Sequence, residues 1–200
     1  ITFQVCDDII KGEFGDKTDD EKVDRAIRVA LAIKTEGVVS APLEGISAIK
    51  IRHDPLGGDP YLSLYFAGPI RAAGGTVQAF AVLIADYVAH KMGIAPWKAS
   101  PDEIGRFVEE VKLYDQEVNL QYPSTKAELE FAVKHLRVEL NGDPTQDREV
   151  AAHRNLKRIE TNFVRSGPCL VLNDGVLLKS KKIMKVIDKM KIEGWEWLPE

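Results

Sequence analysis

A glycine-rich loop at Gly68–Gly75 has a composition that is typical of anion binding. It follows an alternating apolar stretch at Tyr61–Phe66 and precedes a helical pattern of apolar residues that starts at about Thr76. A strand that passes through such a loop into a helix presents free N–H groups to an anion, and Arg71 could add a bidentate contact to a phosphate. The loop therefore predicts a phosphate site, with the Thr76 hydroxyl capping the helix.

The spacing within this loop does not match the known phosphate-binding fingerprints. Ala73 stands where the Walker pattern needs its second glycine, and Ile70 stands where the dinucleotide pattern needs its second glycine. A tight turn, whose glycines permit positive φ and close packing, is the alternative that the spacing favours.

A second candidate site is a set of lysines near the end of the sequence. Residues 148–192 carry 11 Lys and Arg against 4 Asp and Glu, a local charge of +7 in a chain whose net charge is −4. Four lysines share one face of a helix predicted over residues 175–191. They are Lys179, Lys182, Lys185 and Lys189. Such a face is typical of contact with nucleic-acid phosphates, with Arg165 and Arg71 as secondary candidates. The alternative is a solvated lysine face, and no aromatic residues interleave with these lysines to stack on bases.

Patterns for catalysis or metal binding are weak. The 4 histidines form neither H-E-x-x-H nor a zinc spacing with cysteine. Adjacent acidic pairs such as Glu109-Glu110 diverge by about 100° on a helix, which favours solvation or capping over a two-metal site. The sequence predicts no active site, metal or cofactor within this chain.

The helices and strands predicted around these candidate residues follow an α+β pattern. Capping boxes predict three helix starts, at Thr18 with Glu21, at Ser100 with Glu103 and at Thr125 with Glu128. Strands over residues 46–52 and 61–66 are predicted to form an antiparallel hairpin. Further expected features are an extended connector over 38–43, a short strand over 138–140 before an Asn141-Gly142 turn, and a β-rich segment over 148–173 with a buried strand at Cys169–Leu172.

The whole is predicted to be an α+β fold of helices packed on small antiparallel sheets, with a helical segment over residues 1–37 and an α+β module over 38–200. The 2 cysteines form no C-x-x-C pair, which favours reduced thiols in an intracellular, cytoplasmic protein. No apolar run is long enough to suggest a membrane span, and a chain that starts with Ile reads as a piece of a longer protein. Trp195 and Trp197 are expected to pack in the core or against another part of that protein.

Five ordered blocks of the sequence resemble the amino-terminal region of the large subunit of the archaeal D-family DNA polymerase, also called DNA polymerase II. The resemblance covers nearly the whole chain. The blocks are TEGVVSAPLEGI at 35–46, YFAGPIRAAGGT at 65–76, VEEVKLYD at 108–115, ETNFVRSG at 160–167 and IDKMKIEGWEWL at 187–198.

This resemblance implies a module of a replicative, DNA-directed DNA polymerase whose large subunit pairs with a small 3′–5′ exonuclease subunit. The family's Asp-rich motifs, which bind the divalent metal (Mg²⁺), and its cysteine-rich zinc modules do not occur here, so no catalytic residue carries over. The resemblance implies a KH-like element and partners that include DNA, the small subunit and the remaining domains of the large subunit. Two alternatives are an assembly module that associates with itself or its neighbours without DNA affinity, and a nucleotide-phosphate-binding domain that uses the Gly68–Thr76 loop.

Overall fold

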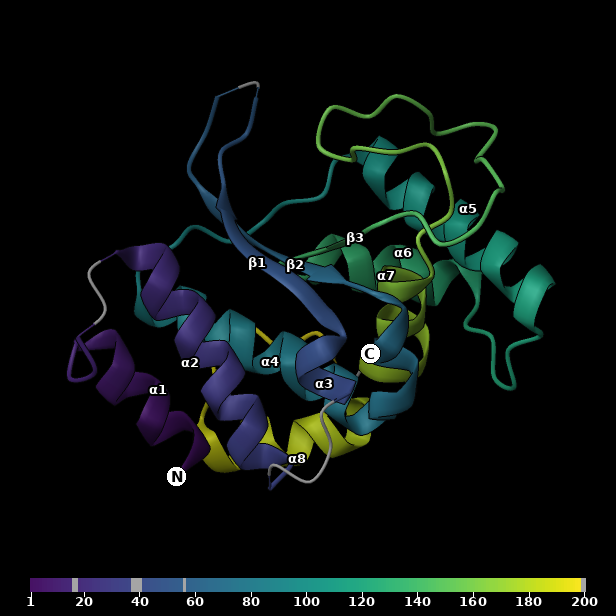
Figure 1. Cartoon of the computed structure of the whole chain (residues 1–200). Helices are drawn as coiled ribbons and strands as arrows, with labels where there is room; N and C mark the ends of the chain where they lie inside the picture. The colour runs from purple at the N-terminus through teal and green to yellow at the C-terminus, as the bar shows by residue number, and fades with distance from the viewer. Residues whose placement is uncertain (16–17, 37–40, 56, 199–200) are drawn as a thin grey trace.

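The structure is a computed structural model that describes residues 1–15, 18–36, 41–55 and 57–198, and its centre is a small mixed sheet (Figure 1). Strands β1 (Ile46–Arg52), β2 (Tyr61–Phe66) and β3 (Glu139–Gly142) lie side by side in the order β1-β2-β3. β1 and β2 form the predicted antiparallel hairpin, but β3 pairs with β2 in parallel. The α+β class is confirmed, whereas the sheet is mixed and not antiparallel throughout.

The Asn141-Gly142 pair ends β3 and does not form the predicted turn. Asn141 lies opposite Tyr65 and Gly142 opposite Phe66. A Cβ atom on Gly142 would lie 2.4 Å from the Phe66 carbonyl oxygen. Glycine is therefore needed here for the close approach of two backbones.

The amino-terminal helices are α1 (Thr2–Ile10), α2 (Asp19–Lys34) and the short α3 (Ala41–Glu44). Thr18 and Glu21 form the predicted capping box, and α1 and α2 pack against each other and against the central helix α4 (Gly75–Lys91). The predicted connector over 38–43 lies partly outside the described residues, and its described end is helical rather than extended. The boundary predicted at residue 37 stays a prediction, as does the KH-like element.

Helix α4 is buried on nearly all sides. It contacts α1, α2 and β2, and its burial extends from Gln78 to Ala89 with the exception of Tyr87. The preceding loop is a 3-10 helix, η1 (Gly68–Ala73), and α4 begins after Gly74, whose φ of +73° favours glycine. Thr76 lies inside the first turn, so the predicted threonine cap is wrong.

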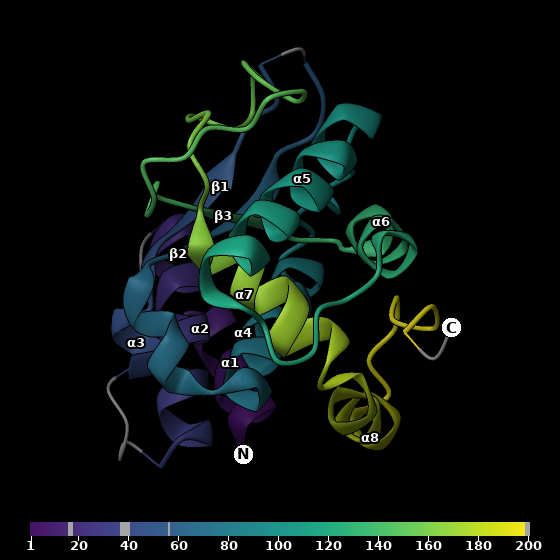
Figure 2. The same ribbon diagram turned by 90° about the vertical axis from the view of Figure 1, so that its right-hand side faces the viewer.

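Helices α5 (Pro101–Val118) and α6 (Lys126–His135) both begin at the predicted capping boxes. The chain then continues through β3 into a long irregular connection over residues 143–165, called here the 143–165 loop. Figures 1 and 2 show this loop, in green, alongside α5. Its described pairing is a single bridge between Glu149 and Phe163, so the predicted β-rich segment is wrong.

The carboxyl-terminal part is helical, not stranded. α7 (Ser166–Leu170) runs into a π-helix, η2 (Val171–Leu177), and α8 (Ser180–Met190) follows. The predicted strand at Cys169–Leu172 is wrong because a short buried apolar run also fits a buried helix. The predicted last helix over 175–191 is split between the end of η2 and α8. No helix of the described ranges has the length and apolar character that a membrane crossing requires.

Candidate nucleic-acid interface

Helix α8 buries Ile183 and presents its lysines on the outside. Lys182, Lys185 and Lys189 are exposed, and Lys179 is half-buried at the residue before the helix. Among the ion pairs found between described residues, none involves these four lysines. The acidic residue within α8 is Asp188. The predicted lysine face is therefore present, and its charge is not neutralised by the described part of the protein.

The amino-terminal end of α8 combines a helix dipole with added positive charge. Lys179 is the N-cap residue and gives no side-chain cap, while Lys181 and Lys182 lie in the first turn. Cations near a helix N-terminus are unfavourable because the free N–H groups already carry partial positive charge. A bound anion would relieve this repulsion.

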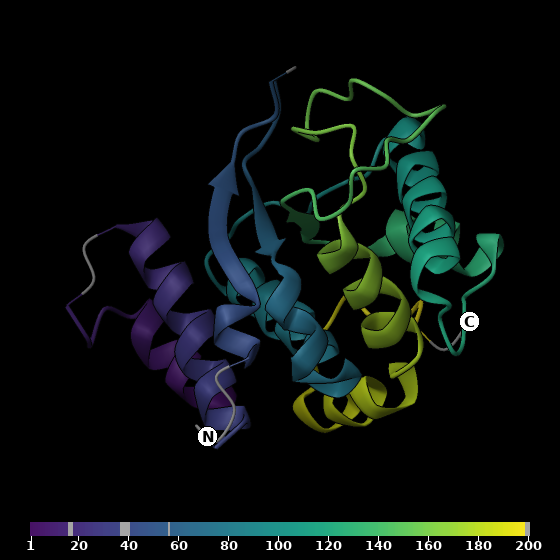
Figure 3. The same cartoon turned by 45° about the vertical axis from the view of Figure 1, so that its right-hand side comes forward.

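The starts of α4 and α8 lie next to each other, and Figure 3 shows the yellow-green α8 below the teal segment of η1 and α4. The Lys182 ammonium donates to the Thr76 hydroxyl oxygen at 3.4 Å. The Lys179 side chain passes over Gly75, where an added Cβ would lie 3.1 Å from Lys179 Cε. Two helix N-termini without side-chain caps therefore meet beside the lysines.

Arg71 lies in η1, three residues before Gly74, and is exposed. Its Nη2 donates to the Tyr114 hydroxyl at 3.1 Å, and the Gln78 amide donates to the Ile70 carbonyl at 3.0 Å, which fastens η1 to α4. Arg71 thus remains available at the surface on the segment that leads into the lysine site.

Arg165 is not part of this surface. It is completely buried, and its Nη2 lies 2.6 Å from Glu110 Oε2 while its Nη1 donates to Asn141 Oδ1 at 2.9 Å. Burial works against the charge, but the Glu110 carboxylate outweighs it and raises the pKa of Arg165. A buried guanidinium cannot reach a phosphate, so Arg165 is removed from the predicted phosphate contacts.

The other arginines near Arg165 also turn inward and hold the 143–165 loop. Arg106 on α5 is buried, pairs with Glu110 and donates to the carbonyls of Thr161 and Phe163 at 2.8 and 3.2 Å. Arg158 binds the Glu103 carboxylate. The local charge of +7 therefore consists of arginines bound to protein acceptors and lysines that face solvent.

The Glu109-Glu110 pair diverges as expected, but neither carboxylate is merely solvated. Glu110 meets the two buried arginines, and Glu109 accepts hydrogen bonds from the backbone N–H groups of Ala151, Ala152 and His153. Burial works against ionisation, but these N–H groups and the His153 side chain outweigh it and lower the pKa of Glu109 to about 2. Arg106 lies only four residues from Glu110, but the loop N–H groups that bind Glu109 and the Arg165 that binds Glu110 lie more than 40 residues away, so sequence reasoning missed both roles.

Across the described ranges, no three His, Cys, Asp or Glu side chains are placed so that they could hold a metal ion.

Comparison with known proteins assigns the chain to a family. The family model of the DNA polymerase II large subunit DP2, N-terminal, matches residues 1–200. The chain belongs to this family. It is 49% identical over 198 residues to the DNA polymerase II large subunit of Methanococcus maripaludis, and 50% identical over 200 residues to that of Thermococcus kodakarensis. It covers 17% and 11% of these two proteins, while 98% of the chain is matched in each. The Pyrococcus furiosus large subunit is 49% identical over 203 residues, which span the whole chain and 16% of that protein.

Within this DNA polymerase II large subunit region, two of the five sequence blocks coincide with the buried arginine network. The block at 108–115 supplies Glu109 and Glu110 on α5, and the block at 160–167 supplies Arg165. The last block covers the end of α8 and the stacked Trp195 and Trp197 rings, whose centroids lie 5.6 Å apart. The resemblance stated from the sequence is thus confirmed.

Proposed function

We propose that this chain is a non-catalytic module of a DNA polymerase II large subunit that contacts DNA phosphates and supports assembly of the enzyme. The observation that carries the DNA contact is the lysine surface, defined as Lys179, Lys182, Lys185 and Lys189 with Arg71 as an auxiliary cation. These lysines have no ion-pair partner among the described residues, and two of them, Lys179 and Lys182, adjoin two helix N-termini. This arrangement suits a phosphate backbone without base readout.

For the whole protein, the proposal is DNA-directed DNA synthesis in replication. The relatives are named DNA polymerase II large subunit, and the chain spans about a sixth of the length of those from Methanococcus maripaludis and Pyrococcus furiosus. Phosphoryl transfer would use divalent metal bound in another part of the large subunit. The remaining domains and a small 3′–5′ exonuclease subunit are the proposed protein partners.

The rival proposal is an assembly module without DNA affinity. It is favoured by apolar side chains that remain exposed on and next to α8, namely Leu178 at 42% and Met190 at 41%. It predicts association that depends on protein concentration and no DNA binding at moderate salt. The nucleotide-binding alternative at Gly68–Thr76 has less support, because Gly75 already serves close packing against the Asp174 carbonyl.

DNA binding by two variants of equal net charge tests the proposal. In the first, Lys179, Lys182, Lys185 and Lys189 are all replaced by Glu. In the control, four exposed lysines elsewhere are replaced by Glu; these are Lys98, Lys112, Lys134 and Lys157. We expect the α8 variant to lose at least about tenfold in affinity for a labelled oligonucleotide and the control to lose much less. Equal losses would mean that net charge alone acts and would contradict a site on α8.

A further inference from the structure

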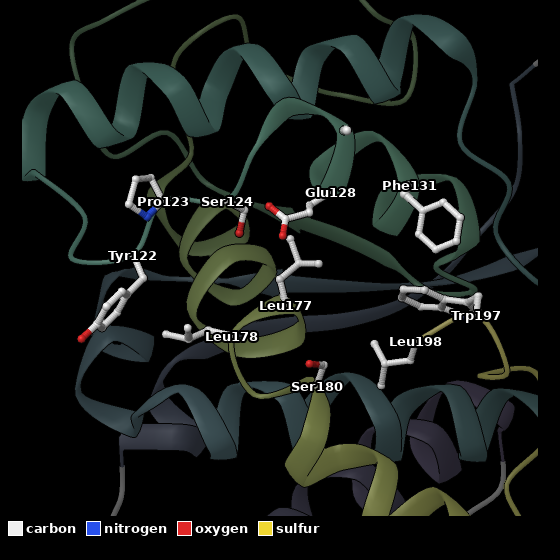
Figure 4. A pocket seen from close by; sticks show the side chains of 11 residues that line it. Tyr122, Pro123, Ser124, Glu128, Phe131, Leu177, Leu178, Ser180, Trp197 and Leu198 are labelled. Carbon is white, nitrogen blue, oxygen red and sulfur yellow. The ribbon is translucent and has the colours of Figure 1, made fainter. Parts of the chain in front are cut away.

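A cavity of about 670 Å³ lies between α6, the end of η2, the start of α8 and the carboxyl-terminal segment (Figure 4). Its walls are mainly apolar and aromatic and include Phe131, Leu177, Leu178, Trp197 and Leu198. This volume lies within the range of sites for small organic ligands. Tyr122, which is 59% exposed, stands at the opposite end of the cavity from Trp197.

A few polar groups project into the cavity from fixed positions. Figure 4 shows the side chains of Ser124, Glu128 and Ser180 pointing inward. The Ser124 backbone is held by Asn173 Oδ1 at 2.8 Å, and Glu128 Oε2 accepts from the Thr125 backbone at 2.7 Å. Glu128 is exposed, and its Oε1 takes part in no hydrogen bond found among the described residues, so a ligand N–H could replace water there.

The aromatic wall is rigid because its rings support one another. The Trp197 ring stacks with His135 and with Trp195, each with ring centroids 5.6 Å apart, and forms an edge-to-face pair with Phe131 at 6.1 Å. Trp195 is in turn fixed by a 2.6 Å hydrogen bond from its Nε1 to Asp86 Oδ2. A preformed wall lowers the ordering cost when a flat ligand enters.

The cavity borders the lysine surface. Ser180, which lines the cavity, is the first residue of α8 and lies between Lys179 and Lys181. A ligand in the cavity therefore lies beside the helix end where positive charge is concentrated. An apolar, aromatic recess next to cations suits a ligand that joins a flat ring to a phosphate.

We propose that this cavity receives a nucleobase of single-stranded DNA, with the neighbouring phosphate on Lys179 and Lys182. This inference rests on the proposed DNA contact of α8, and it adds that the bound DNA is single-stranded. Bases in a duplex are stacked and paired and cannot enter a recess, whereas bases of a single strand can turn out of the backbone. The lysine surface favours this occupant over an apolar peptide, which would leave the positive charge without a partner.

The test compares three labelled ligands by fluorescence anisotropy: a 12-mer of thymidine, a 12-mer of abasic sites with the same phosphates, and a 12-base-pair duplex. We expect the thymidine strand to bind about tenfold more tightly than the abasic strand, because a base in an aromatic site contributes roughly that much or more. The variant Ala127→Leu places extra methyl groups in the cavity from an exposed position of α6. It should reduce the preference for thymidine and leave abasic binding unchanged. The matched control is Ala151→Leu, at an exposed alanine outside the cavity.

The outcomes separate this inference from the proposed function. Equal binding of the thymidine and abasic strands, or an unchanged preference in Ala127→Leu, would overturn the base site while leaving the phosphate contact intact. No binding of any ligand would overturn both. Competition by free thymidine monophosphate at micromolar concentration would assign the cavity to single nucleotides and overturn the strand proposal. An Ala127→Leu variant that changes only the sedimentation of the protein would identify a protein-docking groove instead.

Discussion

Arg165 and Glu110 form a completely buried ion pair, with 2.6 Å between Nη2 and Oε2. Arg106 shares the same carboxylate at 3.2 Å, so one negative charge supports two guanidinium groups in the interior. The three side chains join α5 to the 143–165 loop and to the start of α7. The network therefore gives structure to a segment that has little regular secondary structure of its own.

Removing Glu110 is predicted to cost more stability than removing Arg165. Glu110→Gln leaves two buried cations without their counter-charge, and we expect a loss of about 3–5 kcal/mol in the free energy of unfolding. Arg165→Met leaves Glu110 paired with Arg106, so the loss should be smaller. Urea unfolding followed by circular dichroism measures both. A smaller loss for Glu110→Gln than for Arg165→Met would contradict a shared carboxylate.

Stability is predicted to fall in acid through Glu109. Its pKa is lowered to about 2 in the folded protein, whereas an unfolded glutamate titrates at about 4.3. The stabilisation is therefore complete above about pH 5 and is lost as the pH falls toward 2. Glu109→Gln should show a weaker decline than the unchanged protein over this window. Parallel stability curves for the two proteins would show that the loop does not depend on this charge.

Gly75 is predicted to tolerate no side chain. A Cβ atom there would lie 2.2 Å from the Asp174 carbonyl oxygen in η2, so Gly75→Ala must push α4 and η2 apart. We expect a loss of about 1–3 kcal/mol. The control is Gly68→Ala, because the space around Gly68 is open and its φ is not in the left-handed region. Thermal unfolding compares the two variants, and equal effects would refute the close contact.

Asp86 is predicted to hold the carboxyl-terminal segment. Its carboxylate accepts from Trp195 Nε1 at 2.6 Å and lies 3.2 Å from Arg137 Nε. Asp86→Ala leaves both donors without this acceptor, and we expect a cost of about 1–3 kcal/mol together with faster proteolysis after residue 190. Trp195→Phe removes one donor and also replaces the buried indole with a smaller ring, so it should loosen the segment at least as much. Unchanged proteolysis in Asp86→Ala would show that the segment is held by apolar packing alone.

Local signals predicted the local parts of this fold. The helix starts were predicted correctly at Thr18, Ser100 and Thr125, because a capping box depends only on two residues that are three positions apart. Cys169–Leu172 was misassigned because four buried apolar residues have no period that separates a strand from a helix. The parallel pairing of β3 with β2 depends on residues that are about 75 positions apart, which no local pattern contains.

The candidate site also has parts that local spacing predicts and parts that depend on distant residues. The lysine face follows from the three- and four-residue spacing of the lysines, and Lys182, Lys185 and Lys189 lie exposed on α8, whereas Lys179 lies before this helix and is half-buried. Arg165 is buried because it pairs with Glu110, which is 55 residues away in the chain. The burial of Arg165 could therefore not be predicted from the sequence. The aromatic cavity was missed because α6, η2 and the carboxyl-terminal segment each supply part of it.

The salt dependence of DNA binding shows whether the lysines of α8 contact DNA phosphates. The affinity of the chain for an oligonucleotide is measured over a series of salt concentrations, beside the variant with Glu at Lys179, Lys182, Lys185 and Lys189. Each phosphate contact contributes about 0.7–0.9 to the slope of log affinity against log salt. We predict weaker binding in the variant and a slope flatter by about 3, because four contacts are lost. An unchanged affinity and slope would contradict the assignment of α8 as the DNA-contacting helix.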